Sequence, residues 1–286
     1  MPDPEISIVI VSWNVRDLLI ASLRSMDRFV HAAREVVVVD NHSADGTVDL
    51  LRREFPAITV IANDRNAGFA RANNQGWQRT RGSYICFLNP DTEFINDPFP
   101  ELLAELKRHP QTGCVAPRLL NADRSLQPSV RRWPQFADQA LVLLKLRSMS
   151  TWLAPLRRYQ VDAGAAGKGR QAVDQVMGAV MVLPRTVLEE AGAFDEKYWI
   201  WFEEVDLCQR LKRRGYDVIY LPQAAIVHLG GRSFAQHLSL AKHVWWLKSL
   251  ARYVGRYWPP LPRYALYLLM PISYVLTVLQ TFVKPK

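Results

Sequence analysis

The chain's first candidate for chemistry is the tripeptide Asn89-Pro90-Asp91, which follows the apolar run at residues 84–88. An unbroken apolar run of this length is typical of a strand buried on both faces, and Pro90 prevents the strand from continuing. Asp91 is therefore expected at the carboxyl end of a central strand, where ligands bind in open α/β sheets. A carboxylate there can hold a divalent cation against a diphosphate, although an Asx-type turn that only ends the strand is the alternative.

A second acidic group begins a predicted helix much later in the chain. Glu203, Glu204 and Asp206 fall in its first turn, where the helix dipole favours anions, so ordinary charge placement is one explanation. That explanation does not cover the aromatic and apolar run at residues 198–202 immediately before them. Aromatic faces pack well on the C–H faces of sugar rings, although packing in a core strand is their commoner use.

Two other polar positions end apolar runs. Asp40 and Asn41 follow residues 35–39, and their side chains can hydrogen-bond a base or a ribose hydroxyl, with simple turn chemistry as the alternative. His228 ends the short run 225–227 beside glycines. A neutral imidazole there could ligate a metal, although a lone histidine is more often structural.

The elements that must position these groups alternate along the first third of the chain. Strands are predicted at 6–12, 35–39, 58–62 and 84–88, and helices at 17–29, 48–55 and 70–80. This alternation predicts right-handed βαβ units and a mostly parallel sheet. No G-x-G-x-x-G follows the first strand and no G-x-x-x-x-G-K-[ST] occurs, so dinucleotide oxidoreduction and P-loop chemistry are disfavoured.

The pattern after residue 97 is less regular. An apolar segment at 136–156 is interpreted as one helix, either interfacial or packed on the body, and the glycine-containing segment 160–171 as a flexible loop. The remaining predictions are helices at 98–109, 186–191 and from about 203 to a stop at Gly215, strands at 113–117, 174–183, 216–221 and 225–228, and a turn at 121–124.

The composition is that of a folded protein, with 49% apolar residues. Cys86, Cys114 and Cys208 form no metal-binding spacing and favour a reducing, cytosolic location. No signal peptide is recognisable, because residues 1–5 are acidic and a strand begins at residue 6.

The positive charge is concentrated at the C-terminal end. The formal charge is +9, and after Asp217 there is no acidic residue. An uncharged stretch at 264–283 is long enough to span a bilayer or to lie on its surface, so we expect an anionic membrane as partner and no nucleic acid. The basic residues of this tail are Arg232, Lys242, Lys248, Arg252, Arg256, Arg263, Lys284 and Lys286, of which Arg263, Lys284 and Lys286 are predicted anchors.

Taken in order, five motifs resemble the family 2 glycosyltransferases, most closely bacterial rhamnosyltransferase-like members. The matching segments are residues 9–14, 38–47, 66–76, 87–92 and 201–207. The resemblance covers about residues 6–232 and implies the α/β GT-A fold of nucleotide-diphospho-sugar transferases, a twisted, mostly parallel sheet flanked by helices. It implies a domain at 1–232, with a nucleotide-binding half at about 1–117 and an acceptor half at about 118–232, followed by a membrane-associated helical tail at 233–286.

The resemblance also implies roles for individual residues. Asp40 corresponds to the residue that binds the nucleotide base, and Glu204 to the general base of an acidic pair with Glu203. Asp91 is the last position of a D-x-D metal motif in which Asn89 stands first, and His228 is a third ligand for Mg²⁺ or Mn²⁺. The donor contacts are Ser12, Asn14, Asp40, Asn41, Ser43, Asn66, Gly68, Phe69, Asn73, Asn89 and Asp91, and the acceptor contacts are Gly178, Trp199, Trp201 and Asp206.

The activity implied is inverting transfer of a sugar, with rhamnose a candidate, from a nucleotide-diphospho-sugar to a cell-surface polysaccharide or lipid-linked glycan. The expected location is the cytoplasmic face of the inner membrane. The alternatives are a non-catalytic, membrane-attached nucleotide-sugar-binding relative and a nucleotidyltransferase, although residues 12–16 lack the glycine-rich basic loop of the latter. Sugar transfer requires Asp91 and Glu204 to face one crevice.

Overall fold

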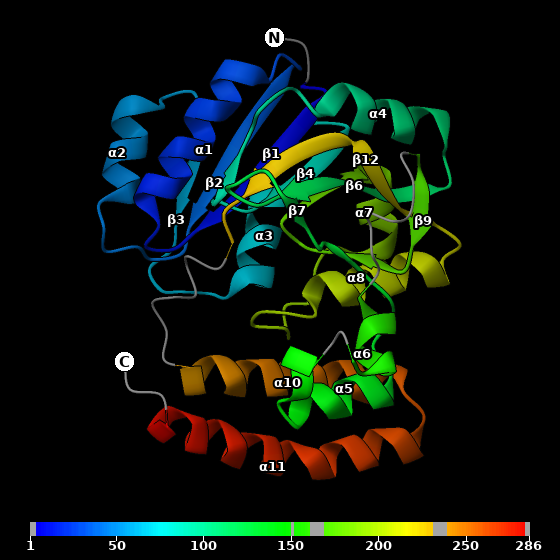
Figure 1. Cartoon of the computed structure of the whole chain (residues 1–286). Helices are drawn as coiled ribbons and strands as arrows, with labels where there is room; N and C mark the ends of the chain where they lie inside the picture. Colours follow the sequence, from blue (N-terminus) through cyan, green and yellow to red (C-terminus); the bar gives the residue numbers. More distant parts are fainter. Residues whose placement is uncertain (1–3, 150–151, 161–168, 231–238, 284–286) are drawn as a thin grey trace.

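The computed structural model describes residues 4–149, 152–160, 169–230 and 239–283 (Figure 1). Its N-terminal part is the parallel half of a large sheet, with strand order β3-β2-β1-β4. The strands are β1 (Ile6–Ser12), β2 (Arg34–Asp40), β3 (Thr59–Ala62) and β4 (Tyr84–Leu88), connected by α1 (Arg16–Phe29), α2 (Thr47–Glu54) and α3 (Phe69–Trp77). The predicted alternation of strands and helices is confirmed. β1 is buried along its whole length, and β2 and β4 each end in four buried residues, most of them apolar.

The other half of the sheet is mixed. β11 (Val180–Pro184) lies antiparallel between β4 and β6 (Thr112–Leu120), and β12 (Asp217–His228) runs parallel to β6. β5 (Thr92–Glu93) and β9 (Gln171–Val173) pair with β12, and β7 (Leu126–Gln127) pairs with β6 across the predicted turn. β8 (Val130–Arg131) and β10 (Gln175–Val176) form a separate small sheet.

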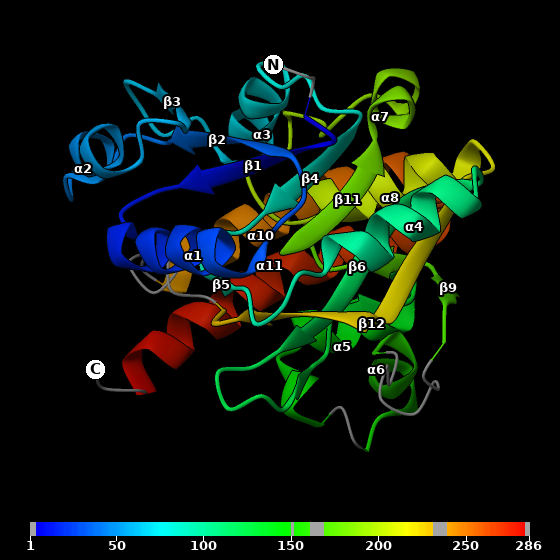
Figure 2. The same ribbon diagram turned by 90° about the horizontal axis from the view of Figure 1, so that it is seen from above.

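Helices cover both faces of the large sheet (Figure 2). α1 and α4 (Phe99–Arg108) pack on one face, where they contribute to the larger apolar core. On the other face lie α3, α7 (Arg185–Ala191) and α8 (Glu203–Arg213). The sheet therefore lies between two layers of helices, which leave the ends of its strands uncovered.

Three predictions about single elements were wrong. Residues 136–156 are not one helix but α5 (Phe136–Leu143), a 3₁₀ turn η1 (Leu146–Met149) and the start of α6 (Ala154–Tyr159), because Lys145 has a left-handed backbone with φ +64°. Residues 174–183 are two strands, β10 and β11, in different sheets. The strands predicted at 216–221 and 225–228 are one strand, β12, with an irregular register between Leu221 and Ala225.

The C-terminal tail is helical, as predicted. α10 (Ser239–Tyr257) and α11 (Pro260–Val283) lie side by side beneath the sheet layer together with α5 (Figure 1). Leu250, Tyr253 and Leu266 of these helices form one apolar cluster with Tyr198 and Phe202. The predicted domain boundary at 232/233, most of the predicted loop at 160–171, and the basic residues Arg232, Lys284 and Lys286 lie outside the described residues.

Candidate active site

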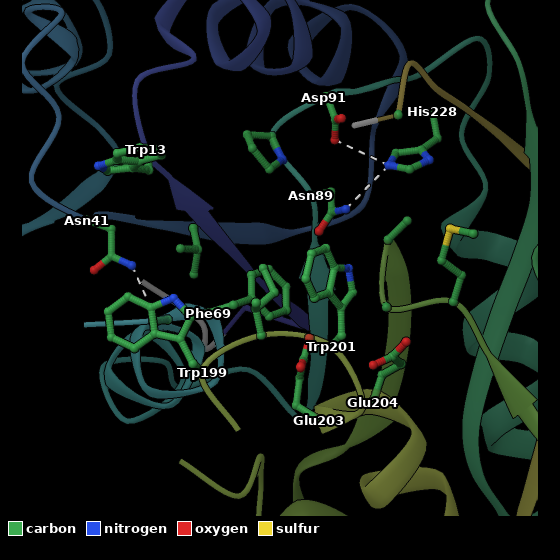
Figure 3. A pocket seen from close by; sticks show the side chains of 18 of the residues that line it. Trp13, Asn41, Phe69, Asn89, Asp91, Trp199, Trp201, Glu203, Glu204 and His228 are labelled. Carbon is green, nitrogen blue, oxygen red and sulfur yellow. Dashed lines mark hydrogen bonds and ion pairs between the residues drawn. The ribbon is translucent and has the colours of Figure 1, made fainter. Parts of the chain in front are cut away.

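The candidate site is a cavity of about 610 Å³ at the carboxyl ends of β1, β2 and β4. The Asp91–Asn89–His228 group lies on one side and the Glu203–Glu204 pair on the other, with Trp201 between them in the view of Figure 3. Asp91 and Glu204 therefore do face one crevice. The cavity is lined by Val11, Trp13, Asn41, Asn66, Gly68, Phe69, Asn89, Pro90, Asp91, Gln127, Arg131, Met177, Gly178, Ala179, Trp199, Ile200, Trp201, Glu203, Glu204, His228, Gly230 and Trp245.

The imidazole of His228 joins the two polar residues that follow β4. Its Nε2 lies 3.3 Å from Oδ1 of Asp91 and 3.3 Å from Nδ2 of Asn89 (Figure 3). All three side chains line the cavity, and those of Asp91 and His228 are 7% exposed. Among the described residues, no group of three or more His, Cys, Asp and Glu side chains could hold a metal, so a cation here would rely on one carboxylate, one imidazole and one carboxamide.

Gln127, which the sequence analysis did not single out, determines the tautomer of His228. Its Nε2 donates to Oδ1 of Asn121 and to the carbonyl of His228, so its Oε1 is the atom that faces Nδ1 of His228 at 2.7 Å. Nδ1 therefore carries the proton, and Nε2 presents a lone pair towards Asp91. Two acceptor atoms 3.3 Å apart are a favourable place for a divalent cation, so the residues present fit a metal.

The two glutamates begin α8 with little solvent around them. Among the described residues, neither the Oε2 of Glu203 nor that of Glu204 has a hydrogen-bond partner, and both atoms are buried. Burial raises the pKa of both carboxyl groups, and the charge of Glu204 raises the pKa of Glu203 further. The positive charge of Arg131 opposes the rise in pKa only at Glu204, so Glu204 is the member of the pair that ionises first.

The aromatic run before α8 is an irregular loop. Trp201 and Phe202 both have left-handed backbones, with φ +61° and +68°, which is uncommon for bulky residues. The loop is attached to the start of α3, where the amide of Phe69 donates to the carbonyl of Trp199 at 2.9 Å. The predicted acceptor residues Trp199 and Trp201 thus line the cavity, with the Trp199 side chain 40% exposed.

Gly178 explains how Glu204 reaches the cavity. A Cβ atom at residue 178 would lie 3.3 Å from Cβ and 3.6 Å from Cγ of Glu204. The backbone between β10 and β11 therefore passes close to the Glu204 side chain. The same segment separates β10 from β11, which were predicted as one continuous strand at 174–183. A glycine within a strand pattern signals such a close approach of backbone.

The predicted donor residues at the ends of β1 and β2 form a hydrogen-bonded group beside the cavity. Asp40 Oδ2 accepts from the amide of Ser43, Ser43 Oγ accepts from the amide of Asn14, and Asn14 Oδ1 accepts from the amide of Ala44. Among the described residues, Ser12 Oγ and Asp40 Oδ1 are buried without a partner on adjacent strands.

Asn41, one of the predicted donor residues, lines the cavity and also hydrogen-bonds to the loop that forms part of its wall. Its Oδ1 accepts from the side chain of Asn63 and the amide of Ala67, and its Nδ2 donates to Oδ1 of Asn66. Asn66 Oδ1 also accepts from the amide of Gly68. These contacts fix the loop that carries Asn66, Gly68 and Phe69 into the cavity.

Six predicted site residues do not line this cavity: Ser12, Asn14, Asp40 and Ser43 belong to the hydrogen-bonded group beside it, and Asp206 and Asn73 are buried elsewhere. Asp206 is fully buried, and its carboxylate pairs with Arg210 at 2.8 Å and with Arg256 and Tyr257 at 2.9 and 2.7 Å. These contacts attach α10 to α8, so the structure corrects the expectation that Asp206 touches an acceptor. Asn73 is 1% exposed and donates to the carbonyl of Phe69 within α3, so it supports the donor wall from behind.

The lining residues that sequence reasoning did not assign to the site include three large side chains besides Gln127. Arg131 comes from β8, Met177 from the crossing segment and Trp245 from α10. Trp13, quoted only as part of a motif, lines the cavity at the end of β1. The sequence does show that Trp245 belongs to a tail rich in tryptophan, with Trp246 and Trp258 nearby. No local sequence pattern marks an arginine in a two-residue strand.

Comparison with known proteins identifies the family. A sequence model described as "Glycosyl transferase family 2" matches residues 7–161, more than half of the chain. The chain is 24% identical over 249 residues to N-acetylglucosaminyl-diphospho-decaprenol L-rhamnosyltransferase of Mycobacterium tuberculosis (strain ATCC 25618 / H37Rv), covering 81% of this chain and 80% of that protein. It is 26% identical over 200 residues to rhamnosyltransferase WbbL of Escherichia coli (strain K12), covering 66% of this chain and 70% of that protein.

Solved structures confirm the predicted fold. The mannosyltransferase PcManGT from Pyrobaculum calidifontis, in complex with GDP-Man and Mn²⁺, superposes with a TM-score of 0.59 at 17% identity. The match covers 99% of this chain and 76% of that one, so it includes the C-terminal helices as well as the sheet. The chain therefore belongs to glycosyltransferase family 2 and is a glycosyltransferase with a GT-A fold.

Proposed function

We propose that this enzyme transfers a sugar, with inversion, from a nucleotide-diphospho-sugar to a hydroxyl of a lipid-linked or glycan acceptor at the cytoplasmic face of the inner membrane. The observation that carries the proposal is one cavity in which Asp91 and His228, which can ligate a metal, lie opposite the Glu203–Glu204 pair. Two relatives are named as rhamnosyltransferases, and the name of one specifies a diphospho-decaprenol. Rhamnose and a polyprenyl diphosphate are accordingly the first donor sugar and acceptor class to test.

The donor's nucleotide would lie at the ends of β1 and β2. Within the described part of the chain, Asp40 Oδ1 and Ser12 Oγ are buried there without hydrogen-bond partners, and a buried acceptor that lacks a hydrogen bond costs free energy. A base or ribose donating to Asp40 would remove that cost. Trp13 and Phe69 line the adjacent wall and offer apolar faces to the nucleotide.

The donor's diphosphate would lie beside Asp91. Asp91, His228 and Asn89 would hold Mg²⁺ or Mn²⁺, and a cation bound there would neutralise the negative charge that develops on the leaving diphosphate. Gln127 keeps the proton of His228 on Nδ1, which leaves Nε2 free to act as a ligand.

The acceptor would approach from the side of α8. Glu204 would take the proton of the attacking hydroxyl, and its raised pKa makes it a stronger base than an exposed glutamate. Glu203, whose pKa is raised well above the usual value, would stay protonated and limit the negative charge of the site. Trp199 and Trp201 would support the sugar ring, and one direct displacement at the anomeric carbon inverts its configuration.

The test separates donor binding from turnover. The wild-type chain is screened with dTDP-rhamnose, UDP-sugars and GDP-sugars in Mn²⁺ or in EDTA, measuring donor affinity by thermal shift and transfer to acceptor by product formation. Glu204→Gln is expected to lower turnover by about 10²–10⁴-fold with donor affinity retained. Asp91→Ala is expected to weaken donor binding in Mn²⁺.

An exposed glutamate of α7 supplies the control. Glu189→Gln makes the same chemical change outside the site and is expected to leave turnover and donor affinity unchanged. Near-normal turnover of Glu204→Gln would refute the base assignment. Equal donor affinity of the wild type in Mn²⁺ and EDTA would refute the metal site.

A further inference from the structure

A second cavity of about 460 Å³ adjoins the first one. It lies between the segment that contains α5, η1 and α6 and the two C-terminal helices, which Figure 1 shows grouped beneath the sheet. Arg131, Trp201 and Glu204 line both cavities, so the proposed base is also part of the wall of the second one.

The lining of this second cavity is strongly cationic. Arg131, Lys145, Arg147 and Lys242 all line it, and the one carboxylate among its described lining residues is Glu204. Lys145 lies with Nζ 3.4 Å from both ring nitrogens of His243, which also lines the cavity. Burial lowers the pKa of Lys145, and burial and the Lys145 charge lower the pKa of His243 to about 4.

We propose that the second cavity binds the diphosphate of a lipid-linked acceptor through Lys145, Arg147 and Lys242. This inference rests on the proposed function, because it takes Glu204 as the base that receives the acceptor's proton. In an acceptor whose sugar is joined directly to a diphosphate, one sugar ring separates the attacking hydroxyl from the anion. The cationic side chains and Glu204 line the same cavity, as such an acceptor needs.

The surroundings of the cavity suit the rest of a lipid-linked acceptor. Trp246 and Val142 contribute apolar surface, and Thr277 brings α11 to the lining. α11 also exposes large apolar side chains such as Leu268 and Ile272. A diphosphate held by the lysines would therefore sit between the base and an apolar helix that can meet the lipid chain.

A binding experiment in EDTA tests the proposal. Farnesyl diphosphate, farnesol and inorganic pyrophosphate are titrated into the full chain, following the fluorescence of its tryptophans, of which Trp201 and Trp246 line the cavity. Lys145→Gln with Arg147→Gln should weaken farnesyl diphosphate binding by about tenfold or more, because each lost charge removes a charge-assisted hydrogen bond. Arg157→Gln with Arg158→Gln removes two exposed charges of α6 outside the cavity and should change affinity less than about twofold.

The remaining titrations distinguish a lipid diphosphate from free pyrophosphate as the ligand, and they exclude misfolding of the variant. Farnesol should bind wild type and Lys145→Gln/Arg147→Gln alike, and Lys145→Arg/Arg147→Lys should restore farnesyl diphosphate binding, which shows that the fold is intact. Unchanged farnesyl diphosphate affinity in the glutamine variant would overturn the proposal, as would pyrophosphate binding as tightly as farnesyl diphosphate. Loss of donor binding or of transfer by the wild type would instead count against the proposed function, because this titration uses neither donor nor metal.

Discussion

At the scale of single residues, the site separates two adjacent carboxylates by what surrounds each. Glu203 and Glu204 are consecutive; Glu203 is buried, Glu204 is half-buried, and both have raised pKa values. Arg131 lies close enough to oppose the rise at Glu204, whereas no cation does so at Glu203 among the described residues. General-base catalysis requires an ionised carboxylate, which the charge of Arg131 favours at Glu204.

This difference predicts how stability depends on pH. Above pH 4.5 the unfolded chain ionises Glu203, whereas the folded chain keeps the proton, so wild-type stability falls as pH rises until the folded pKa is passed. Glu203→Gln cannot ionise, so its unfolding free energy relative to wild type should rise over that range. The gain is about 1.4 kcal/mol per unit of pKa shift, measured by urea unfolding from pH 4 to 8. A flat result for Glu203→Gln over this pH range would contradict the buried protonated carboxyl.

At the scale of elements, the loop before α8 determines where both glutamates point. Trp201 and Phe202 have positive φ values, each of which costs on the order of 1–3 kcal/mol, so the loop needs support from its surroundings. Part of that support comes from Gly68, where a Cβ would lie 3.0 Å from Cε3 and from the carbonyl oxygen of Trp199. The start of α3 and the loop before α8 therefore fit together only with glycine at residue 68.

Gly68→Ala tests this fit, and Gly215→Ala is its matched control. Both glycines have φ +86°, but no atom lies within 4 Å of a Cβ at residue 215. Both variants should lose on the order of 1–3 kcal/mol of unfolding free energy, because each backbone has a positive φ. Gly68→Ala should lose more, and it alone should lower turnover, because Trp199 must move. Equal effects of the two substitutions on turnover would show that the contact with Trp199 does not position the site.

The elements also show what a sequence can and cannot predict. The first four strands and three helices follow from local patterns, because buried β-branched runs and amphipathic periods carry their own signal. The polar residues at the strand ends followed from the same patterns. The breaks at Lys145 and at residues 177–179 did not, since each depends on what packs against the backbone from elsewhere. Gln127 and Arg131 were missed for the same reason, because two-residue strands leave no periodic trace.

At the scale of the whole molecule, a helical layer separates the catalytic sheet from one outer surface (Figure 1). Leu266, Ser273 and Thr277 are on the buried side of α11, so this helix lies along α10 and α5. Its segment Pro260–Thr281 is long and apolar enough to cross a membrane, and 17% of its most apolar window is buried. The exposed large apolar side chains of α11 are Leu261, Tyr264, Leu268, Ile272, Tyr274, Val275 and Leu279.

The spacing of these exposed side chains places most of them on one stripe of α11, and we expect that stripe to rest in the membrane interface with the basic tail residues around it. Vesicles of phosphatidylethanolamine and phosphatidylglycerol should bind the chain more tightly than vesicles of phosphatidylcholine alone, as measured by flotation. Leu268 is 76% exposed, and Leu268→Asp should weaken binding by about tenfold or more, since a buried leucine contributes roughly 1.5–3 kcal/mol. Leu126→Asp is the same substitution at a 36% exposed residue of β7, and this variant should bind vesicles as tightly as the wild type. If Leu268→Asp also floated like wild type, the outer face of α11 would not be the surface that meets the lipid, and the acceptor would have to reach Glu204 by another route.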